Sequence, residues 1–194
     1  MKLPSTSSLL LACLGASVTI ANTPPANCAI DDSSPILPSV VFPIKYRDDV
    51  SPTPSGEALI TEQNGTGWVF DLPELPAAST CVLTFTFKYC TDLLLAGYPC
   101  HEWSGLKQQK LRGSGMSIFH LMSYYIPFET LDYPVQLTPG ELTWVGTFDC
   151  GGSLKMIKFG ARALNEWYLK YNQMGIGQWK DSNGEGAAVY VCHK

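Results

Sequence analysis

The stretch Trp68–Cys90 alternates between two kinds of side chain. From Cys81 to Tyr89 every second residue is a cysteine, a leucine or an aromatic, and the residues between them are Val82, Thr84, Thr86 and Lys88. Alternation of this kind, in a run rich in β-branched and aromatic residues, is typical of a half-buried strand. We therefore predict a central strand at this position, with the Cys81 side chain facing the core.

Further short apolar segments, separated by glycine and proline turns, predict more strands. They are Trp68–Phe70, Met116–Met122, Leu154–Phe159 and Ala187–Val191. The segment 163–173 is ambiguous, because its apolar residues repeat at helical spacing while its aromatics and its context favour a strand. Regularly spaced short strands predict an all-β fold, and we expect an antiparallel β-sandwich stapled by disulfides.

A hairpin is predicted around Pro139-Gly140, with Val135–Thr138 and Leu142–Cys150 as its arms. Proline at the first central position and glycine at the second suit a type II turn. In the second arm Leu142, Trp144, Phe148 and Cys150 share one parity and are expected on one face. Cys150 is therefore also predicted to point into the core.

The N-terminal region has the pattern of a secretory signal peptide. Lys2 precedes an apolar run from Leu9 to Ile20, and small residues before Asn22 predict cleavage after Ala21. A membrane anchor is the alternative, but the run is shorter than the roughly 20 residues of a bilayer span. The expected organisation is a signal peptide (1–21), a Pro/Ser-rich leader (22–55) with an edge strand at Val40–Tyr46, and a sandwich domain (56–194).

Six cysteines stay after cleavage, an even number that predicts three disulfides in a secreted chain. Cys81 and Cys150 have the inward parity of their two strands, which favours a bond between them. The short loop between Cys90 and Cys100 favours a second bond, and Cys28–Cys192 follows by elimination. Fifteen pairings are possible, and spacing alone does not exclude the others. No cysteines have Cys-x-x-Cys spacing and the three histidines are scattered, so no metal or other cofactor is expected.

Charge and sequence motifs restrict the partners and the compartment. The formal net charge of −4 argues against nucleic-acid binding, which needs a basic face. Asn64-Gly65-Thr66 is an N-glycosylation sequon that we predict to lie in a Gly-rich turn just before the strand at Trp68, and we expect Asn64 to carry a glycan. The expected protein is an extracellular or cell-wall glycoprotein without a membrane span.

Several short motifs occur in a fixed order: FDLP at Phe70–Pro73, the strand at Thr80–Phe85, GSGMSIFHL at Gly113–Leu121, LTPGELTW at Leu137–Trp144 and TFDCGG at Thr147–Gly152. This order resembles a fungal secreted family, named for the C-terminal domain of a ubiquitin-3-binding protein of the But-two type, over about Trp68–Cys192. The resemblance implies an all-β secreted or cell-surface domain without an established catalytic constellation. Its matching positions are structural: Phe70, Asp71, Cys81, Gly113, Gly115, Pro139, Gly140 and Cys150. The chain departs from the pattern by inserting the loop Cys90–Cys100 and the long polar stretch after it.

Two classes of function follow from these patterns. The first is a noncatalytic binding module for a cell-wall polysaccharide or another extracellular protein, with Trp103 and Trp179 in loops as candidate sugar-stacking residues. The alternative is a secreted hydrolase whose site is assembled by the fold from dispersed groups. Its candidates are His101, His120, Asp71, Glu74, Asp92, Glu102, Asp149 and Glu166. Ser114 lies in a Gly-Ser-Gly turn that lacks the spacing of a nucleophile elbow, so we predict no catalytic serine there.

Overall fold

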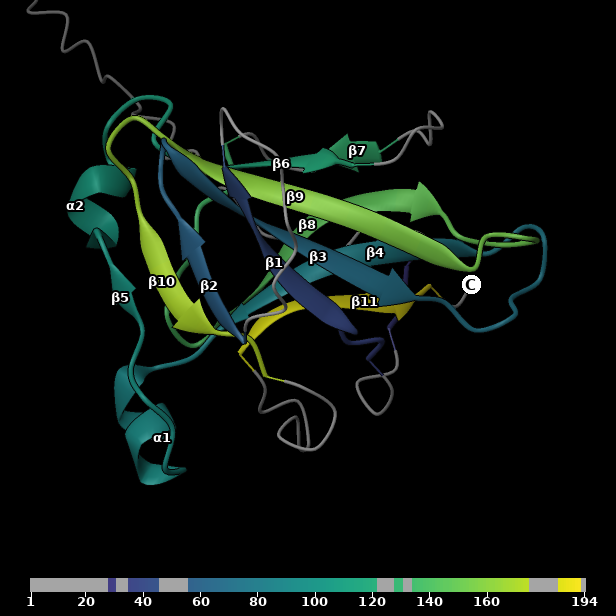
Figure 1. The fold of residues 1–194 in the computed structure, drawn as a ribbon, viewed down its shortest axis with the longest axis horizontal. Helices are drawn as coiled ribbons and strands as arrows, with labels where there is room; N and C mark the ends of the chain where they lie inside the picture. Colours follow the sequence, from purple (N-terminus) through teal and green to yellow (C-terminus); the bar gives the residue numbers. More distant parts are fainter. Residues whose placement is uncertain are drawn as a thin grey trace, which may run out of the picture.

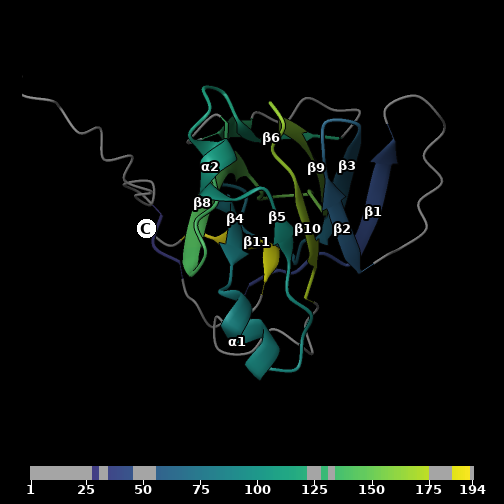
Figure 2. The same ribbon diagram turned by 90° about the vertical axis from the view of Figure 1, so that its left-hand side faces the viewer.

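Two four-stranded antiparallel sheets face each other, with a three-stranded sheet beside them (Figures 1 and 2). The computed structural model describes residues 28–30, 35–45, 56–121, 128–130, 134–174 and 185–192. The first sheet has the order β1-β3-β9-β6, which are Val40–Lys45, Asn64–Asp71, Met156–Leu164 and Gly115–His120. The second has the order β11-β4-β8-β7, which are Gly186–Val191, Thr80–Phe87, Glu141–Asp149 and Phe128–Thr130.

The third sheet has the order β2-β10-β5, which are Glu57–Ile60, Leu169–Asn172 and Glu102–Trp103. Two short helices, α1 (Cys90–Leu95) and α2 (Gly105–Gln109), interrupt the strands. Every strand pair described is antiparallel. The predicted all-β antiparallel sandwich with disulfides is confirmed.

Aromatic rings join the two large sheets across the main core. Trp68 on β3 meets Phe85 on β4 with ring centroids 6.5 Å apart, and Phe159 on β9 meets Phe148 on β8 at 5.2 Å. Both contacts are edge-to-face, the arrangement that the ring quadrupoles favour. Residues of the third sheet, Ala58, Ile60, Leu169 and Tyr171, pack into the same cluster and close one side of it.

A buried chain of hydrogen bonds links one strand of each sheet. The Trp68 indole N–H donates to the Tyr171 hydroxyl at 3.1 Å, and that hydroxyl donates to the Gln173 amide oxygen at 3.3 Å. Gln173 in turn bonds both the N–H and the C=O of Ala187, at 2.8 and 3.1 Å. Burial raises the pKa of the Tyr171 phenol well above its ordinary value, so the phenol stays neutral. Because each buried polar group finds a partner, the chain fixes how the three sheets meet.

The central strand β4 is buried on both faces, so the prediction that it is half-buried is wrong. Its Cys81 side faces the main core as predicted, but Val82, Thr84 and Thr86 are also buried. A second apolar cluster covers that outer face, and it includes Cys28, Leu37, Leu93 and Met174. Sequence alternation identified the strand correctly but did not show that other segments cover its polar side.

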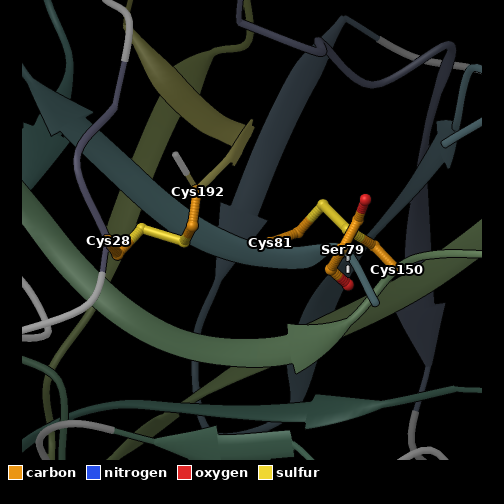
Figure 3. Close-up of a disulfide and its surroundings, with 5 residues drawn as sticks. All are labelled: Cys28, Ser79, Cys81, Cys150 and Cys192. Atoms are coloured by element: carbon orange, nitrogen blue, oxygen red, sulfur yellow. Dashed lines mark hydrogen bonds between the residues drawn. A yellow bond between two sulfur atoms is a disulfide. The ribbon is translucent and has the colours of Figure 1, made fainter. Parts of the chain in front are cut away.

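All three predicted disulfides are present: Cys81–Cys150, Cys90–Cys100 and Cys28–Cys192. Figure 3 shows Cys81–Cys150 near Cys28–Cys192, and the Cys192 N–H donates to the Thr80 carbonyl at 2.8 Å, next to Cys81. The Cys150 backbone N–H donates to the Ser79 carbonyl at 3.0 Å, which holds the end of β8 beside the start of β4. Three disulfides are typical of a protein that folds in an oxidising compartment.

The described part of the predicted leader packs on the sandwich. β1 pairs with β3 at the edge of the first sheet, and Pro43 is tolerated there, as predicted. Ile36 forms an antiparallel bridge to Val189 on β11, and Leu37 joins the second cluster. The predicted signal peptide (1–21) and its cleavage point lie outside the described residues.

The turn at Pro139-Gly140 is confirmed, but the predicted hairpin is wrong. Glu141 N–H donates to the Thr138 carbonyl at 3.2 Å, and Gly140 has a φ of +86°, as a type II turn requires. However, Val135 bridges to Met116 on β6, while β8 pairs with β4 and β7. The chain therefore crosses between sheets at this turn instead of folding back on itself.

A β-bulge explains a second error in the same strand. The register between β4 and β8 shifts between Leu83 and Thr84, so that Val145 is the extra residue. As a result Trp144 faces the outer cluster, whereas Val145 and Phe148 face the main core. The predicted common face of Trp144, Phe148 and Cys150 is therefore wrong, although Cys150 is buried as predicted.

In the ambiguous segment 163–173 the preference for a strand is confirmed. β9 runs to Leu164, and β10 begins at Leu169. Asn165 and Glu166 both have positive φ, and they form the tight turn between β9 and β10. The helical spacing of the aromatics therefore spans two strands and a turn.

Candidate functional site

Three consecutive leucines lie on α1, inside the loop that the Cys90–Cys100 disulfide closes. Successive residues of a helix point about 100° apart, so a single turn cannot bury all three against the same surface. Leu93 is buried in the outer cluster, while Leu94 is 60% and Leu95 is 87% exposed. Figures 1 and 2 show α1 projecting beyond the sheets, so these two leucines lie on a protruding element.

The end of α1 is fixed by its own backbone. Gly97 has a φ of +79°, its N–H donates to the Leu94 carbonyl at 3.1 Å, and the Tyr98 N–H donates to the Leu93 carbonyl at 2.9 Å. This pair of bonds is a Schellman motif, which needs a residue with positive φ after the helix. The loop therefore presents its two exposed leucines on a backbone held by a helix cap and a disulfide.

A hollow of about 380 Å³ lies beside α1. Its volume is at the low end of the range of small-molecule pockets, about 300–1,000 Å³. The lining is mostly apolar, with two charged side chains, and consists of Leu93, Leu95, Ala96, Tyr98, Met174, Lys88 and Asp92. We call this hollow, together with the exposed Tyr89, Leu94 and Leu95, the α1 patch. Among the described residues it holds three of the six large apolar side chains that are exposed.

A buried histidine–carboxylate pair anchors the loop that carries the α1 patch. His101, the residue after Cys100, lies 2.8 Å from a Glu185 carboxylate oxygen through its Nδ1 atom. The side chains are only 4% and 1% exposed, and the His101 ring packs on Phe87 with centroids 4.2 Å apart. The Met174 N–H donates to the Glu185 carbonyl, which joins the pair to one wall of the hollow. The pair therefore connects the loop to the start of β11.

Burial raises the pKa of the Glu185 carboxyl above its ordinary value of about 4.5, and the hydrogen bond from His101 offsets part of this effect. A carboxyl with a raised folded-state pKa favours the fold when it is protonated. This contribution is fully present below pH 4.5 and is lost as the pH rises through the folded-state pKa. Each pH unit by which the pKa is displaced corresponds to about 1.4 kcal/mol.

We therefore predict that Glu185→Gln flattens the pH dependence of stability. The free energy of unfolding would be measured in urea from about pH 4.5 to about pH 7.5. Relative to the wild-type value, the value for the variant should increase as the pH rises. Glu74→Gln, at an exposed position, is the matched control and should follow the wild-type curve. A Glu185→Gln curve parallel to the wild type would contradict this account of the pair.

Of the two candidate sugar-binding tryptophans, the structure describes one. Trp103 lies on β5 and pairs with Leu169 on β10. It is therefore part of a sheet, and the prediction that it lies in a loop is wrong. Its ring is half-buried and meets Phe87 edge-to-face at 5.0 Å. Trp179 lies outside the described residues. Sugar binding at these two residues stays a prediction.

The candidate histidines lie in separate places. His101 is engaged with Glu185, whereas His120 lies at the end of β6 with its ring 5.7 Å from Phe159. Burial lowers the pKa of His120, which favours its neutral form. No contact within the described ranges joins the two imidazoles, so they do not form a common site there.

The candidate carboxylates are dispersed over the surface. Glu102 forms an ion pair with Lys170 at 3.8 Å, and Asp92 lines the hollow. All of the candidates are exposed: Asp71, Glu74, Asp92, Glu102, Asp149 and Glu166. The hollow holds one of these carboxylates and neither histidine. Within the part of the chain that the structure describes, no cluster of three or more His, Cys, Asp or Glu side chains is arranged to bind a metal.

The sequon lies at the start of β3. The prediction that it lies in the turn before the strand is therefore wrong. Asn64 is half-buried at the edge of the strand, and the Thr66 hydroxyl is buried. That hydroxyl bonds both the N–H and the C=O of Leu59 at 3.0 Å, which connects β2 to β3 where the two strands separate. Thr66 therefore has a structural role, and glycosylation of Asn64 stays a prediction.

Sequence reasoning missed the α1 patch and the His101–Glu185 pair. The signal for the patch was present, because three leucines followed by glycine between two cysteines cannot all be buried by one helical turn. The pair had no such signal, since 84 positions separate its members. Among the described residues, no helix is both long and apolar enough to cross a bilayer.

Comparison with known proteins gives no relative: the chain matches no protein-family model, no curated protein and no solved structure. The resemblance to the But-two type family stays a prediction.

Proposed function

We propose that this protein is a noncatalytic, secreted binding module that recognises another extracellular protein through the α1 patch. The observation that carries the proposal is the exposure of Leu94 and Leu95 on a protruding, disulfide-closed loop beside an apolar hollow. Soluble proteins rarely leave apolar side chains clustered in this way unless they serve an interaction. The rigid sandwich holds the patch in a fixed shape, which lowers the entropy lost on binding.

The composition of the patch favours a protein over a polysaccharide as the partner. Sugar rings stack on flat aromatic faces, whereas the most exposed residues here are branched aliphatic leucines. An apolar centre with tyrosine and methionine, bordered by a few charges, is typical of a protein interface. Polysaccharide binding is the second arm of the test below.

A binding role also agrees better with the ionisable groups than the hydrolase alternative does. Hydrolysis by paired carboxylates needs two of them facing one substrate. The hollow supplies Asp92 alone, and the His101 Nδ1 atom is engaged with Glu185. The described residues thus give the hydrolase alternative no support.

Secretion is part of the same proposal. Its support is the apolar N-terminal run in the sequence and the three disulfides, which persist in oxidising compartments. The resemblance to a fungal secreted family points the same way. Finding the processed chain, beginning at Asn22, in the culture fluid of the producing cells would test this part.

Leu94→Asp combined with Leu95→Asp is expected to abolish partner binding without unfolding the protein. Both side chains are exposed, so the free energy of unfolding should change by no more than about 0.5 kcal/mol for each substitution. The immobilised wild-type protein and the double variant would be compared for retention of extracellular proteins from the producing cells. The same proteins would be incubated with insoluble chitin, glucan and cellulose.

Leu111→Asp is the matched control, because Leu111 is 47% exposed and follows α2, which is well separated from α1 (Figure 1). The proposal requires a protein retained by the wild type and by the control but not by the double variant. Equal retention by all three would contradict it. Binding to a polysaccharide that the double variant shares would also contradict it.

A further inference from the structure

The α1 patch combines a projecting part and a recessed part side by side. Leu94 and Leu95 project from α1. Leu95 also lines the hollow, together with residues that include Leu93, Tyr98 and Met174. A two-fold interface must be complementary to itself, because the same surface is used by both copies. A projection beside a hollow meets this condition, since each copy's projection can enter the hollow of the other.

The charges of the patch fit the same symmetry. Lys88 and Asp92 both line the hollow, and Asp92 acts electrostatically on Lys88. When two copies face each other about a two-fold axis, the lysine of each copy can approach the aspartate of the other. A patch with one sign of charge would instead repel its copy.

We propose that the α1 patch is the interface of a symmetric dimer of this chain, with Leu94 and Leu95 of each copy in the hollow of the other. This inference rests on the proposed function, because it uses the same surface and names a second copy as its partner. The patch contains three exposed apolar side chains and one small hollow. It has far fewer residues than the roughly 20–30 per partner of a stable interface, so the dimer is weak and reversible, with a Kd of about micromolar or higher.

Sedimentation velocity over a wide concentration range tests the dimer. The mass of the wild-type protein should rise from monomer towards dimer as the concentration increases, and Leu111→Asp should behave in the same way. Leu94→Asp with Leu95→Asp should remain a monomer throughout. A wild-type mass that stays monomeric at every concentration, or a dimer that persists in the double variant, would overturn the inference.

Charge reversal tests the symmetry. Asp92→Lys gives a patch with two positive charges, and Lys88→Asp gives one with two negative charges, so each variant alone should dimerise at least ten-fold more weakly. A mixture of the two variants should form a heterodimer, because each patch then meets the opposite sign. If Lys88→Asp does not fold, Asp92→Lys alone suffices: its dimer should be weaker than wild type in low salt and recover in high salt. An Asp92→Lys dimer as strong as wild type would contradict the arrangement.

The two proposals fail in different ways. If the wild-type protein is monomeric but the leucine variant loses a protein that the wild type retains, the dimer is wrong and the binding function stands. If the wild type dimerises through the patch and retains no other protein, the recognition of another extracellular protein is wrong and the dimer stands.

Discussion

Replacing Cys81 and Cys150 by alanine is expected to lower the free energy of unfolding by about 4 kcal/mol. The disulfide joins residues 69 positions apart, and closing so long a loop removes much of the conformational entropy of the unfolded chain. The two cysteines are 0% and 1% exposed, so the lost packing adds to the effect. The melting temperature should fall by roughly 8–16 °C, as scanning calorimetry would show.

The matched comparison is Cys90→Ser with Cys100→Ser. This pair closes a loop of only 10 positions and both residues are half-buried, so its loss should cost less, about 3 kcal/mol. Peptide mapping without reduction should first recover all three linkages. A cost for the short-loop variant that equals or exceeds that of Cys81→Ala with Cys150→Ala would show that loop entropy does not control these contributions.

The strands and two of the disulfides were predictable because their signals are local or depend on parity, and Cys28–Cys192 then followed by elimination. Cys81 begins one alternating run and Cys150 ends another, and the inward direction of each follows from the two-residue period of a strand. Pro139-Gly140 was predictable as a turn because glycine alone takes positive φ there without strain. These features need no knowledge of what lies across the fold.

The predictions of side-chain direction and burial were wrong where these depend on contacts with a distant segment of the chain. A single bulge opposite Leu83 reversed the parity of Trp144, and nothing within β8 itself indicates this extra residue. The outer face of β4 carries threonines, which are typical of a solvent-exposed face, yet Cys28, Leu37 and Leu93 cover it. Both outcomes depend on contacts between residues far apart in the chain.

The candidate site could be predicted only in part for the same reason. The exposed leucines of α1 follow from one segment, but the hollow needs Met174 from a distant one. Glu185 was not among the candidate carboxylates, because only the fold brings it to His101. Trp103 was predicted in a loop, since the two-residue strand β5 is too short to show alternation.

The core prediction with the largest effect concerns Phe159, which has no exposed surface. Its ring meets Phe70 on β3, His120 on β6 and Phe148 on β8, at 6.2, 5.7 and 5.2 Å. Phe159→Ala should therefore cost about 3–5 kcal/mol, because it removes buried surface and leaves a cavity between the two large sheets. Urea denaturation measures this cost, and Phe159→Leu, which keeps much of the volume, should cost less than about 1.5 kcal/mol.

His120 provides a second readout of the same substitution. Burial lowers the pKa of His120 below its ordinary value of 6.5, and the Phe159 ring is part of what covers it. Opening a cavity beside the imidazole should admit water, so the pKa of His120 should rise towards 6.5 in Phe159→Ala when followed by NMR titration. The rise should be smaller in Phe159→Leu, which fills more of the space. A Phe159→Ala variant that loses less than about 1 kcal/mol and leaves the titration of His120 unchanged would show that this ring does not join the two sheets.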